Sequence, residues 1–211
     1  GGIGTATAAR FVDEGARVVA LDRDAAGLER LASRVPLAGA LQADVTDPGQ
    51  VARALAEMDA LVGGPDVLIN NAGISIRHGF LDITPEEWRR VLAVNLEGVF
   101  NVAQEAARRM VAAGAGVIVN MGSTNGLMGY PYYADYNASK AGVIELTRSM
   151  ALELAPAVRV NAVCPGWILT PMQEAEYTPE MRRAFARKVP LQRLGSPDDV
   201  AALFAFLASD D

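Results

Sequence analysis

Short apolar segments alternate with longer segments of helical periodicity along the chain. The short runs hold four or five residues, are rich in branched apolar side chains, and are typical of buried parallel strands. Between them, apolar residues recur at helical spacing, and segment 84–87 combines an N-cap threonine, a proline and a glutamate. The pattern predicts strands at 17–21, 38–42, 66–69, 116–120 and 159–163, helices at 5–14, 25–34, 48–61, 85–113, 136–155 and 197–208, and a proline-containing irregular stretch at 165–190.

Strands that alternate with helices indicate an α/β protein. We predict a Rossmann-like, doubly wound parallel sheet between two layers of helices, as a single domain over residues 1–211. A glycine loop such as residues 1–4 is normally aimed by a preceding strand. We therefore expect a longer natural chain, with one strand before Gly1 and one after Asp211.

Tyr136 and Lys140 stand four residues apart in the segment YNASK. On a helix, residues at this spacing lie on one face, one turn apart. A free tyrosine has a pKa near 10. A neighbouring cation and the positive end of a helix both favour the phenolate, so we expect a pKa below that value for Tyr136. The pair is predicted to be a general acid/base for a hydroxyl or carbonyl substrate, although the spacing alone also fits a surface packing contact.

The composition restricts the classes of function. With 19 basic and 25 acidic residues and no basic run, the net charge of −6 disfavours a nucleic-acid partner. The longest apolar run, Ala201–Ala208, is too short to cross a bilayer, and no export leader is visible, so we expect a cytoplasmic protein without a membrane partner. A single cysteine, Cys164, and a single histidine, His78, disfavour a disulfide framework and a metal site.

The order of the motifs over essentially the whole chain resembles the short-chain dehydrogenase/reductase family. The motifs are the glycine loop at 1–4, the acid Asp22 at a strand end, NNAG at 70–73, Asn95, Gly122-Ser123, Tyr136 with Lys140, and Pro165-Gly166. The resemblance implies an enzyme that transfers a hydride between a nicotinamide cofactor and a secondary alcohol or ketone.

The resemblance also implies four catalytic roles. Tyr136 gives or takes the hydroxyl proton, and Lys140 lowers the pKa of Tyr136 and binds the nicotinamide ribose. Ser123 polarises the substrate carbonyl, and Asn95 supports a proton relay from Lys140. Gly122 replaces the first of the two serines that are common in the family. A serine hydrolase is disfavoured because GSTNG is not G-x-S-x-G and the one histidine lies in an unrelated loop.

The cofactor contacts follow from the same resemblance. Gly2 and Gly4 allow the backbone to approach a pyrophosphate at a helix N-terminus. Asp22, eighteen residues after Gly4, is expected on the adenosine ribose and would repel a 2′-phosphate, so NAD is predicted over NADP. NADP stays an alternative cofactor, because the side chain of Arg23 could reach that phosphate. The remaining implied contacts are Ile3, Asp44, Val45, Asn71, Ala72, Gly73, Pro165, Gly166, Ile168 and Thr170.

Aromatic and amide groups are expected to form the substrate pocket: Asn125, Tyr130, Tyr133 and Trp167 beside Ser123, under a lid at Met172–Arg187. They suit a sugar, a polyol or a small cyclic ketone. Two alternatives stay open, namely a 3-oxoacyl thioester (acyl-carrier) reductase and a non-catalytic nucleotide-binding sensor or scaffold. The family resemblance also implies a homotetramer or homodimer through helices 97–113 and 139–154. The first helix offers Phe100, Ala103, Ala107 and Met110 at helical spacing, and we expect Phe100 or a neighbour to be buried between subunits.

Overall fold

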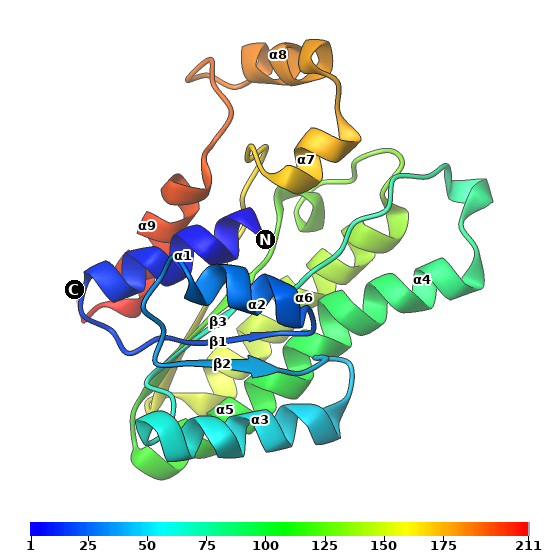
Figure 1. The fold of residues 1–211 in the computed structure, drawn as a ribbon. Helices are drawn as coiled ribbons and strands as arrows, with labels where there is room; N and C mark the ends of the chain where they lie inside the picture. Colours follow the sequence, from blue (N-terminus) through cyan, green and yellow to red (C-terminus); the bar gives the residue numbers. More distant parts are fainter. Residues whose placement is uncertain (211) are drawn as a thin grey trace.

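Helices surround parallel strands in a computed structural model that describes residues 1–210, except the side chains of residues 172, 175 and 176 (Figure 1). The strands are β1 Val19–Asp22, β2 Gly39–Gln42, β3 Val67–Asn70, β4 Gly116–Met121 and β5 Val158–Val163. The helices are α1 Gly2–Asp13, α2 Ala25–Ala32, α3 Pro48–Val62, α4 Pro85–Leu92, α5 Gly98–Ala113, α6 Ala134–Leu154, α7 Pro171–Glu176, α8 Pro179–Lys188 and α9 Pro197–Ala208.

All strand pairs are parallel, as the alternating pattern predicts. β1 pairs with β2, and β4 lies between β3 and β5. Within residues 1–210, no ladder joins β1 to β3, so the strands form two sheets where we predicted one continuous sheet. The predicted α/β class is confirmed, because helices cover both faces of these parallel strands.

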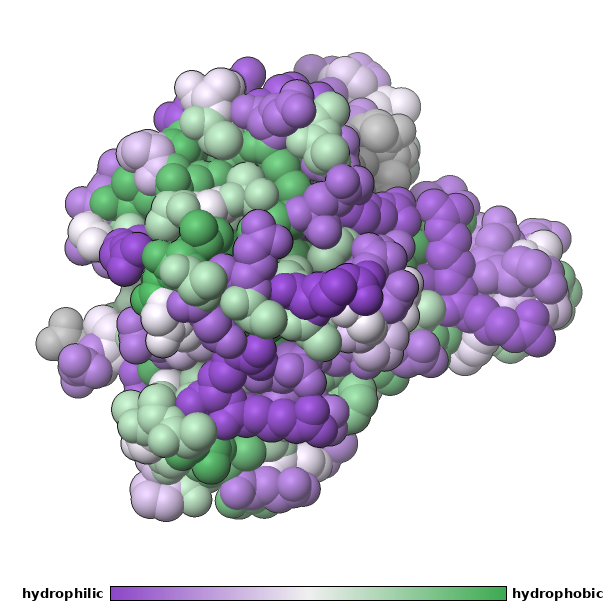
Figure 2. All heavy atoms as spheres, turned by 60° about the horizontal axis from the view of Figure 1, so that its bottom comes forward, coloured by the Kyte–Doolittle hydropathy of each residue, from purple (hydrophilic) through white to green (hydrophobic). Residues whose placement is uncertain are grey.

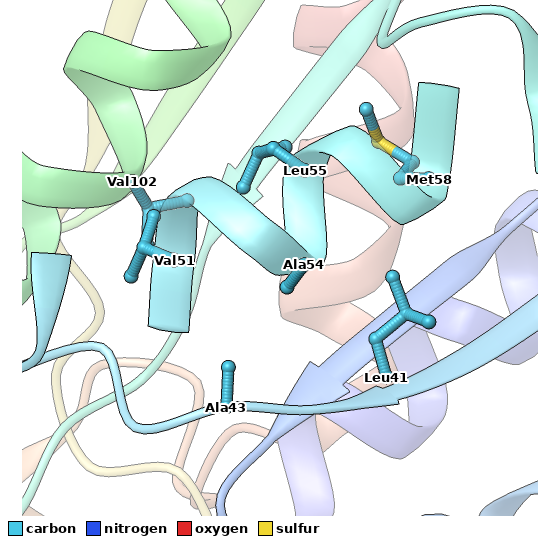
Figure 3. Close-up of a cluster of buried hydrophobic side chains, with 7 residues drawn as sticks. All are labelled: Leu41, Ala43, Val51, Ala54, Leu55, Met58 and Val102. Carbon is cyan, nitrogen blue, oxygen red and sulfur yellow. The ribbon is translucent and has the colours of Figure 1, made fainter. Parts of the chain in front are cut away.

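Three hydrophobic clusters define the layers. Val117 and Val119 of β4 pack against Phe204 of α9, with α1 alongside. Ile118 points to the opposite face and packs against α5. The third cluster joins β2 to α3 and α5 (Figure 3): Leu41, Ala43, Val51, Ala54, Leu55, Met58 and Val102. Alternating residues of one strand therefore fill two cores, as a sheet buried on both faces requires.

The predicted long helix at 85–113 is confirmed, with an interruption. The side chain of Thr84 accepts the N–H of Glu87, and the Glu87 carboxylate accepts the N–H of Thr84, which completes a capping box. A π-helical turn at Ala93–Glu97 separates α4 from α5 and contains Asn95. Such turns recur at functional sites because they reorient one side chain within a continuous helix.

The expectation of an irregular stretch at 165–190 was wrong. Pro171 and Pro179 occupy the first turns of α7 and α8, where a missing N–H is harmless. Thr170 and Thr178 provide the N-caps. The prolines start these two helices, which stand at the top of the molecule in Figure 1.

Two further expectations need adjustment. α1 begins at Gly2, so both glycines of the loop lie in its first turn. Ala103, Ala107 and Met110 are buried in the core of their own chain and cannot face a partner, whereas Phe100 is 46% exposed. Within residues 1–210, no helix combines the length and apolar character that a membrane span requires.

Candidate active site

The predicted site residues meet where the parallel strands end. β4 ends at Met121 and leads to Ser123, β5 leads to Pro165, and β3 leads to the segment Asn71–Gly73, in which Ala72 is exposed. Because parallel strands share one carboxyl edge, these loops lie next to each other. α6 starts at this edge and places Tyr136 in its first turn.

The Lys140 ammonium is buried beside the Tyr136 ring. Lys140 is 2% exposed, its Nζ donates to Met121 O at 2.7 Å, and Nζ lies 5.7 Å from the centre of the Tyr136 ring. Burial lowers the pKa of Lys140 from 10.5 to about 8, and the thiol of Cys164 has a smaller opposing effect. The group therefore stays mostly protonated at pH 7 and places a positive charge next to the phenol.

Ser123 is held by its neighbour Asn125. Its Oγ accepts the N–H of Asn125 at 3.1 Å and donates to Asn125 Oδ1 at 3.4 Å. The Asn125 amide donates to Asn137 Oδ1 at 2.8 Å, which ties this corner to α6. A Cβ at Gly122 would lie 2.7 Å from the sulfur of Cys164, so a second serine there would require Cys164 to shift.

One cavity of about 110 Å³ brings the hydroxyl of Ser123 and the phenol of Tyr136 together. All the predicted substrate residues border it, and so do four residues that we had not named individually: Ser75, Thr124, Gln173 and Tyr177, of which the last two lie in the predicted lid. The full lining is Ser75, Ser123, Thr124, Asn125, Tyr130, Tyr133, Tyr136, Gly166, Trp167, Gln173 and Tyr177.

Aromatic contacts fix the lid over this cavity. The hydroxyl groups of Tyr133 and Tyr177 are hydrogen-bonded to each other. Phe185 of α8 packs edge-to-face on Tyr177 at 4.9 Å and stacks on Trp167 at 5.1 Å. α7 and α8 therefore form the predicted lid, although the side chain of Met172, where we placed its start, lies outside the described part.

Asn95 connects three parts of the site from the π-helical turn. It is fully buried, exchanges hydrogen bonds of 2.8 and 2.9 Å with the backbone of Ile74, and donates to Ser139 Oγ at 3.1 Å. A Cβ at Gly73 would lie 3.3 Å from Asn95 Oδ1 and 3.6 Å from Lys140 Nζ. Asn95, Gly73 and Lys140 are therefore immediate neighbours.

The start of α1 touches two of the predicted cofactor segments. A Cβ on Gly2 would lie 3.1 Å from Pro171 Cδ and 3.8 Å from Thr170 Cβ. A Cβ on Gly4 would lie 3.0 Å from the Asn71 amide nitrogen. The Thr170 hydroxyl also caps α7. The glycines thus let a helix N-terminus approach both loops, and its N–H groups favour an anion there.

Acidic and basic side chains gather at the ends of β1 and β2. Asp22 is exposed, and its Oδ1 accepts the N–H of Asp24 at 3.0 Å. Asp44 Oδ1 accepts the N–H and the hydroxyl of Thr46 at 2.9 and 2.8 Å. These two hydrogen bonds lower the pKa of Asp44, and the charge of Arg23 lowers it further. Both carboxylates are therefore held in place at this edge.

Three predicted cofactor residues are apolar and pack partly into the core. Ile3 and Ile168 lie against the cluster of β4, β5 and α9, and Val45 lies against that of β2 and α3. Ile168 also forms a parallel bridge with Gly195. Only the backbone or one edge of these residues can therefore serve a ligand.

Known proteins share this arrangement over the whole chain. A family model described as "Enoyl-(Acyl carrier protein) reductase" matches residues 1–211. Galactitol 2-dehydrogenase (L-tagatose-forming) of Cereibacter sphaeroides is 41% identical over 99% of this chain and 84% of its own. The chain belongs to the short-chain dehydrogenase/reductase family. This confirms the predicted family, and the chain is an oxidoreductase.

Other members of the family are similarly close. A 3-oxoacyl-[acyl-carrier-protein] reductase of Thermotoga maritima is 42% identical over 100% of this chain and 87% of its own. A gluconate 5-dehydrogenase of Burkholderia cenocepacia, solved with NADP and tartrate, superposes with a TM-score of 0.91 at 34% identity, covering 99% of this chain and 84% of that one.

The residues present fit the dinucleotide that this family uses. The glycines at the start of α1 leave its N–H groups open to a pyrophosphate. At the other end, Gly73 leaves room beside the Lys140 ammonium, a group with three N–H donors of which one binds Met121 O. Asp22 stands at the β1 end, where a carboxylate can bind ribose hydroxyls.

His78 is one residue whose position was wrongly judged. We placed it in a loop unrelated to the site, yet its Nε2 lies 3.0 Å from Oδ2 of Asp135, the residue before Tyr136. The two residues are 57 positions apart, and no local pattern links them. The only signal in the sequence was an aspartate directly before the Tyr136 motif.

Proposed function

We propose that the protein is an NAD-dependent oxidoreductase that interconverts a secondary alcohol and its ketone. One observation carries the proposal: the Ser123 hydroxyl and the Tyr136 phenol border one cavity, and the buried Lys140 ammonium lies 5.7 Å from the Tyr136 ring centre. A neutral hydroxyl, an ionisable phenol and a fixed cation are the groups that proton transfer to a carbonyl oxygen requires.

Each residue has a distinct task in this proposal. The bound nicotinamide supplies or accepts the hydride. Ser123 donates a hydrogen bond to the substrate carbonyl oxygen and fixes its position. Tyr136 gives its proton to that oxygen during reduction and takes it back during oxidation. Lys140 stabilises the phenolate left behind and binds ribose hydroxyls, and Asn95 supports the path by which the proton is replaced.

Asp22 supports NAD as the preferred cofactor. Its carboxylate, anchored by the N–H of Asp24, would accept the ribose hydroxyls and repel a 2′-phosphate. In members of the family that prefer NADP, a basic residue often stands just before the second glycine of the loop, and this chain has Gly1 at that position. Arg23 lies close enough to Asp44 to lower the pKa of that carboxyl, and this interaction competes with a role on a phosphate. The NADP-bound gluconate dehydrogenase makes NADP the cofactor against which the proposal must be tested.

The cavity supports a small polyhydroxylated or cyclic substrate. Its walls combine tyrosine hydroxyls, two amides and an indole, groups that hydrogen-bond hydroxyls and pack against a ring. The galactitol relative acts on a polyol. The Thermotoga maritima relative is a 3-oxoacyl-[acyl-carrier-protein] reductase, so a 3-oxoacyl thioester is the second candidate substrate. The intact set of Ser123, Tyr136 and Lys140 is the reason to prefer an enzyme over a sensor or scaffold.

Exposed apolar residues support assembly into a homodimer or homotetramer. Phe100 and Val111 on α5 and Leu152 on α6 are 46, 48 and 83% exposed. Hydrophobic residues also gather at the upper left of the face shown in Figure 2. Apolar surface of this kind is typical of protein interfaces, and twofold assemblies are the commonest oligomers.

A cofactor and substrate screen tests the function. The full-length protein would be assayed at 340 nm with NAD and NADP against polyols, sugars, cyclic secondary alcohols and a 3-oxoacyl thioester. We expect turnover of a polyol or cyclic alcohol with NAD. Tight NADH binding without turnover of any carbonyl would favour the sensor or scaffold, and turnover of the thioester alone would favour the second candidate.

A further inference from the structure

His78 and Asp135 form a buried pair next to Tyr136. His78 Nε2 lies 3.0 Å from Asp135 Oδ2, and the two side chains are 10 and 0% exposed. A buried carboxylate is costly unless donors compensate it. This contact joins the loop after β3 to the first turn of α6.

Asp135 also holds the backbone of Tyr136. Its Oδ1 accepts the N–H of Tyr136 at 2.7 Å. The N-cap residue Tyr133 offers no side-chain cap, so this carboxylate satisfies one of the N–H groups that the start of a helix leaves open. Its charge also lies at the positive end of α6. The backbone of Tyr136 is thus held by a carboxylate that His78 holds in turn.

The loop that carries His78 is attached on both sides of the site. The N–H of His78 donates to Tyr132 O at 3.1 Å. Earlier in the same loop, Ile74 is bonded to the Asn95 amide and Ser75 borders the cavity. A change at His78 is therefore expected to reach the start of α6 through Asp135 and Tyr132.

The charges around the imidazole favour this arrangement. Nδ1 of His78 lies 3.6 Å from Glu87 Oε2 of α4 and, among the described residues, has no hydrogen-bond partner. Arg90 lies near Glu87, and the Arg77 guanidinium sits 4.3 Å from the centre of the Tyr132 ring. Carboxylates thus face the imidazole from both α4 and α6. Without His78, the buried carboxylate of Asp135 loses the partner of its Oδ2 while Oδ1 still accepts the N–H of Tyr136, and it is expected to reorient.

We propose that His78 and Asp135 are a positioning pair that fixes the first turn of α6 and aims the Tyr136 phenol into the cavity. The inference rests on the proposed function, because the aim of the phenol matters only if Tyr136 transfers the proton. A misplacement of about 1 Å can cost about 10²-fold in rate. Loss of the pair is expected to lower kcat by about 10- to 100-fold and to leave the KM for the cofactor nearly unchanged.

A double-mutant cycle separates positioning from a purely structural role. His78→Leu and His78→Gln would be compared in the parent protein and in Tyr136→Phe, at a temperature where thermal melts show every variant folded. We expect His78→Leu to lower kcat about tenfold or more in the parent and not at all in Tyr136→Phe, because the effect passes through the phenol. His78→Gln, of similar size but with an N–H for Asp135, should recover most of the loss.

Several outcomes would overturn the pair's role. The first is an equal loss of kcat on His78→Leu in the parent and in Tyr136→Phe. The second is the same kcat for His78→Leu and His78→Gln. The third is a His78→Leu protein whose Tm is lower but whose kcat equals that of the parent. If His78→Leu does not fold, Asp135→Ala takes its place: it removes the acceptor of Tyr136 N–H and the partner of His78 Nε2 together, so the same non-additive loss is expected. Normal turnover by Tyr136→Phe would instead refute the proposed function. This variant keeps His78, so its kcat tests the proposed function separately from the role of the pair.

Discussion

Replacing Lys140 by methionine should make the protein more stable and inactive. The side chain of methionine is similar in length and removes the charge. The fall in the pKa of Lys140 from 10.5 to about 8 means that the folded protein holds this charge at a cost of about 3 kcal/mol, since one pKa unit is worth about 1.4 kcal/mol. The lost hydrogen bond to Met121 O offsets about 1 kcal/mol of that gain. We expect the free energy of unfolding to rise by about 2 kcal/mol.

The difference in the free energy of unfolding between Lys140→Met and the parent should depend on pH in a defined direction. Between pH 8 and 10.5 the unfolded chain binds more protons at Lys140 than the folded protein does, so the parental free energy of unfolding rises with pH in this window. Lys140→Met lacks that rise. Its advantage should therefore be full below pH 8 and vanish near about pH 9.5, because about 1.4 kcal/mol is lost per pH unit. By about pH 10.5 only the lost hydrogen bond remains, and the variant should be about 1 kcal/mol less stable than the parent.

Urea unfolding of both proteins at pH 7 and at a pH above 9 measures the difference, with kcat determined in parallel. Lys188→Met is the matched control, because Lys188 is the other lysine of the chain and is exposed. It should change the free energy of unfolding by less than about 0.5 kcal/mol. A Lys140→Met protein that is less stable than the parent at pH 7, or whose advantage does not change with pH, would refute the reasoning.

Three further predictions concern the substrate, the cofactor and the assembly. Ser123→Ala should lower kcat by about 10²-fold, as loss of one preorganised donor does, while a matching loss of NADH affinity would contradict its place on the substrate. Asp22→Ala should narrow the preference for NAD over NADP in kcat/KM, and a parent that already prefers NADP would show that Arg23 decides the choice. Light scattering should give a dimer or tetramer mass that falls in Phe100→Glu, and a monomer mass for the parent would exclude the assembly.

The sequence carries the parts of the site that depend on local spacing. Tyr136 and Lys140 share a face because residues four apart on any helix do. The four residues of the capping box that begins at Thr84 are enough to predict the start of the following helix. The motif order then locates Ser123 and Asn95, which the fold places beside these two residues.

Other features depend on contacts between distant segments and escaped prediction. The pairing of His78 with Asp135 spans 57 positions, and the Tyr133–Tyr177 contact spans 44. The prolines of the lid are ambiguous in sequence, because a proline that ends one helix can equally occupy the first turn of another. The depth of Lys140, and hence its lowered pKa, follows only from the packing around it.

Turnover by Tyr136→Phe tests the central claim most directly. The substitution removes one hydroxyl and leaves the ring that packs beside Lys140 and Tyr133. Single-turnover rates with the best substrate would be measured together with NADH affinity by fluorescence. The account predicts a rate at least about 10²-fold lower with unchanged NADH affinity, as expected for a lost general acid. A variant that turns over at a near-parental rate would contradict it.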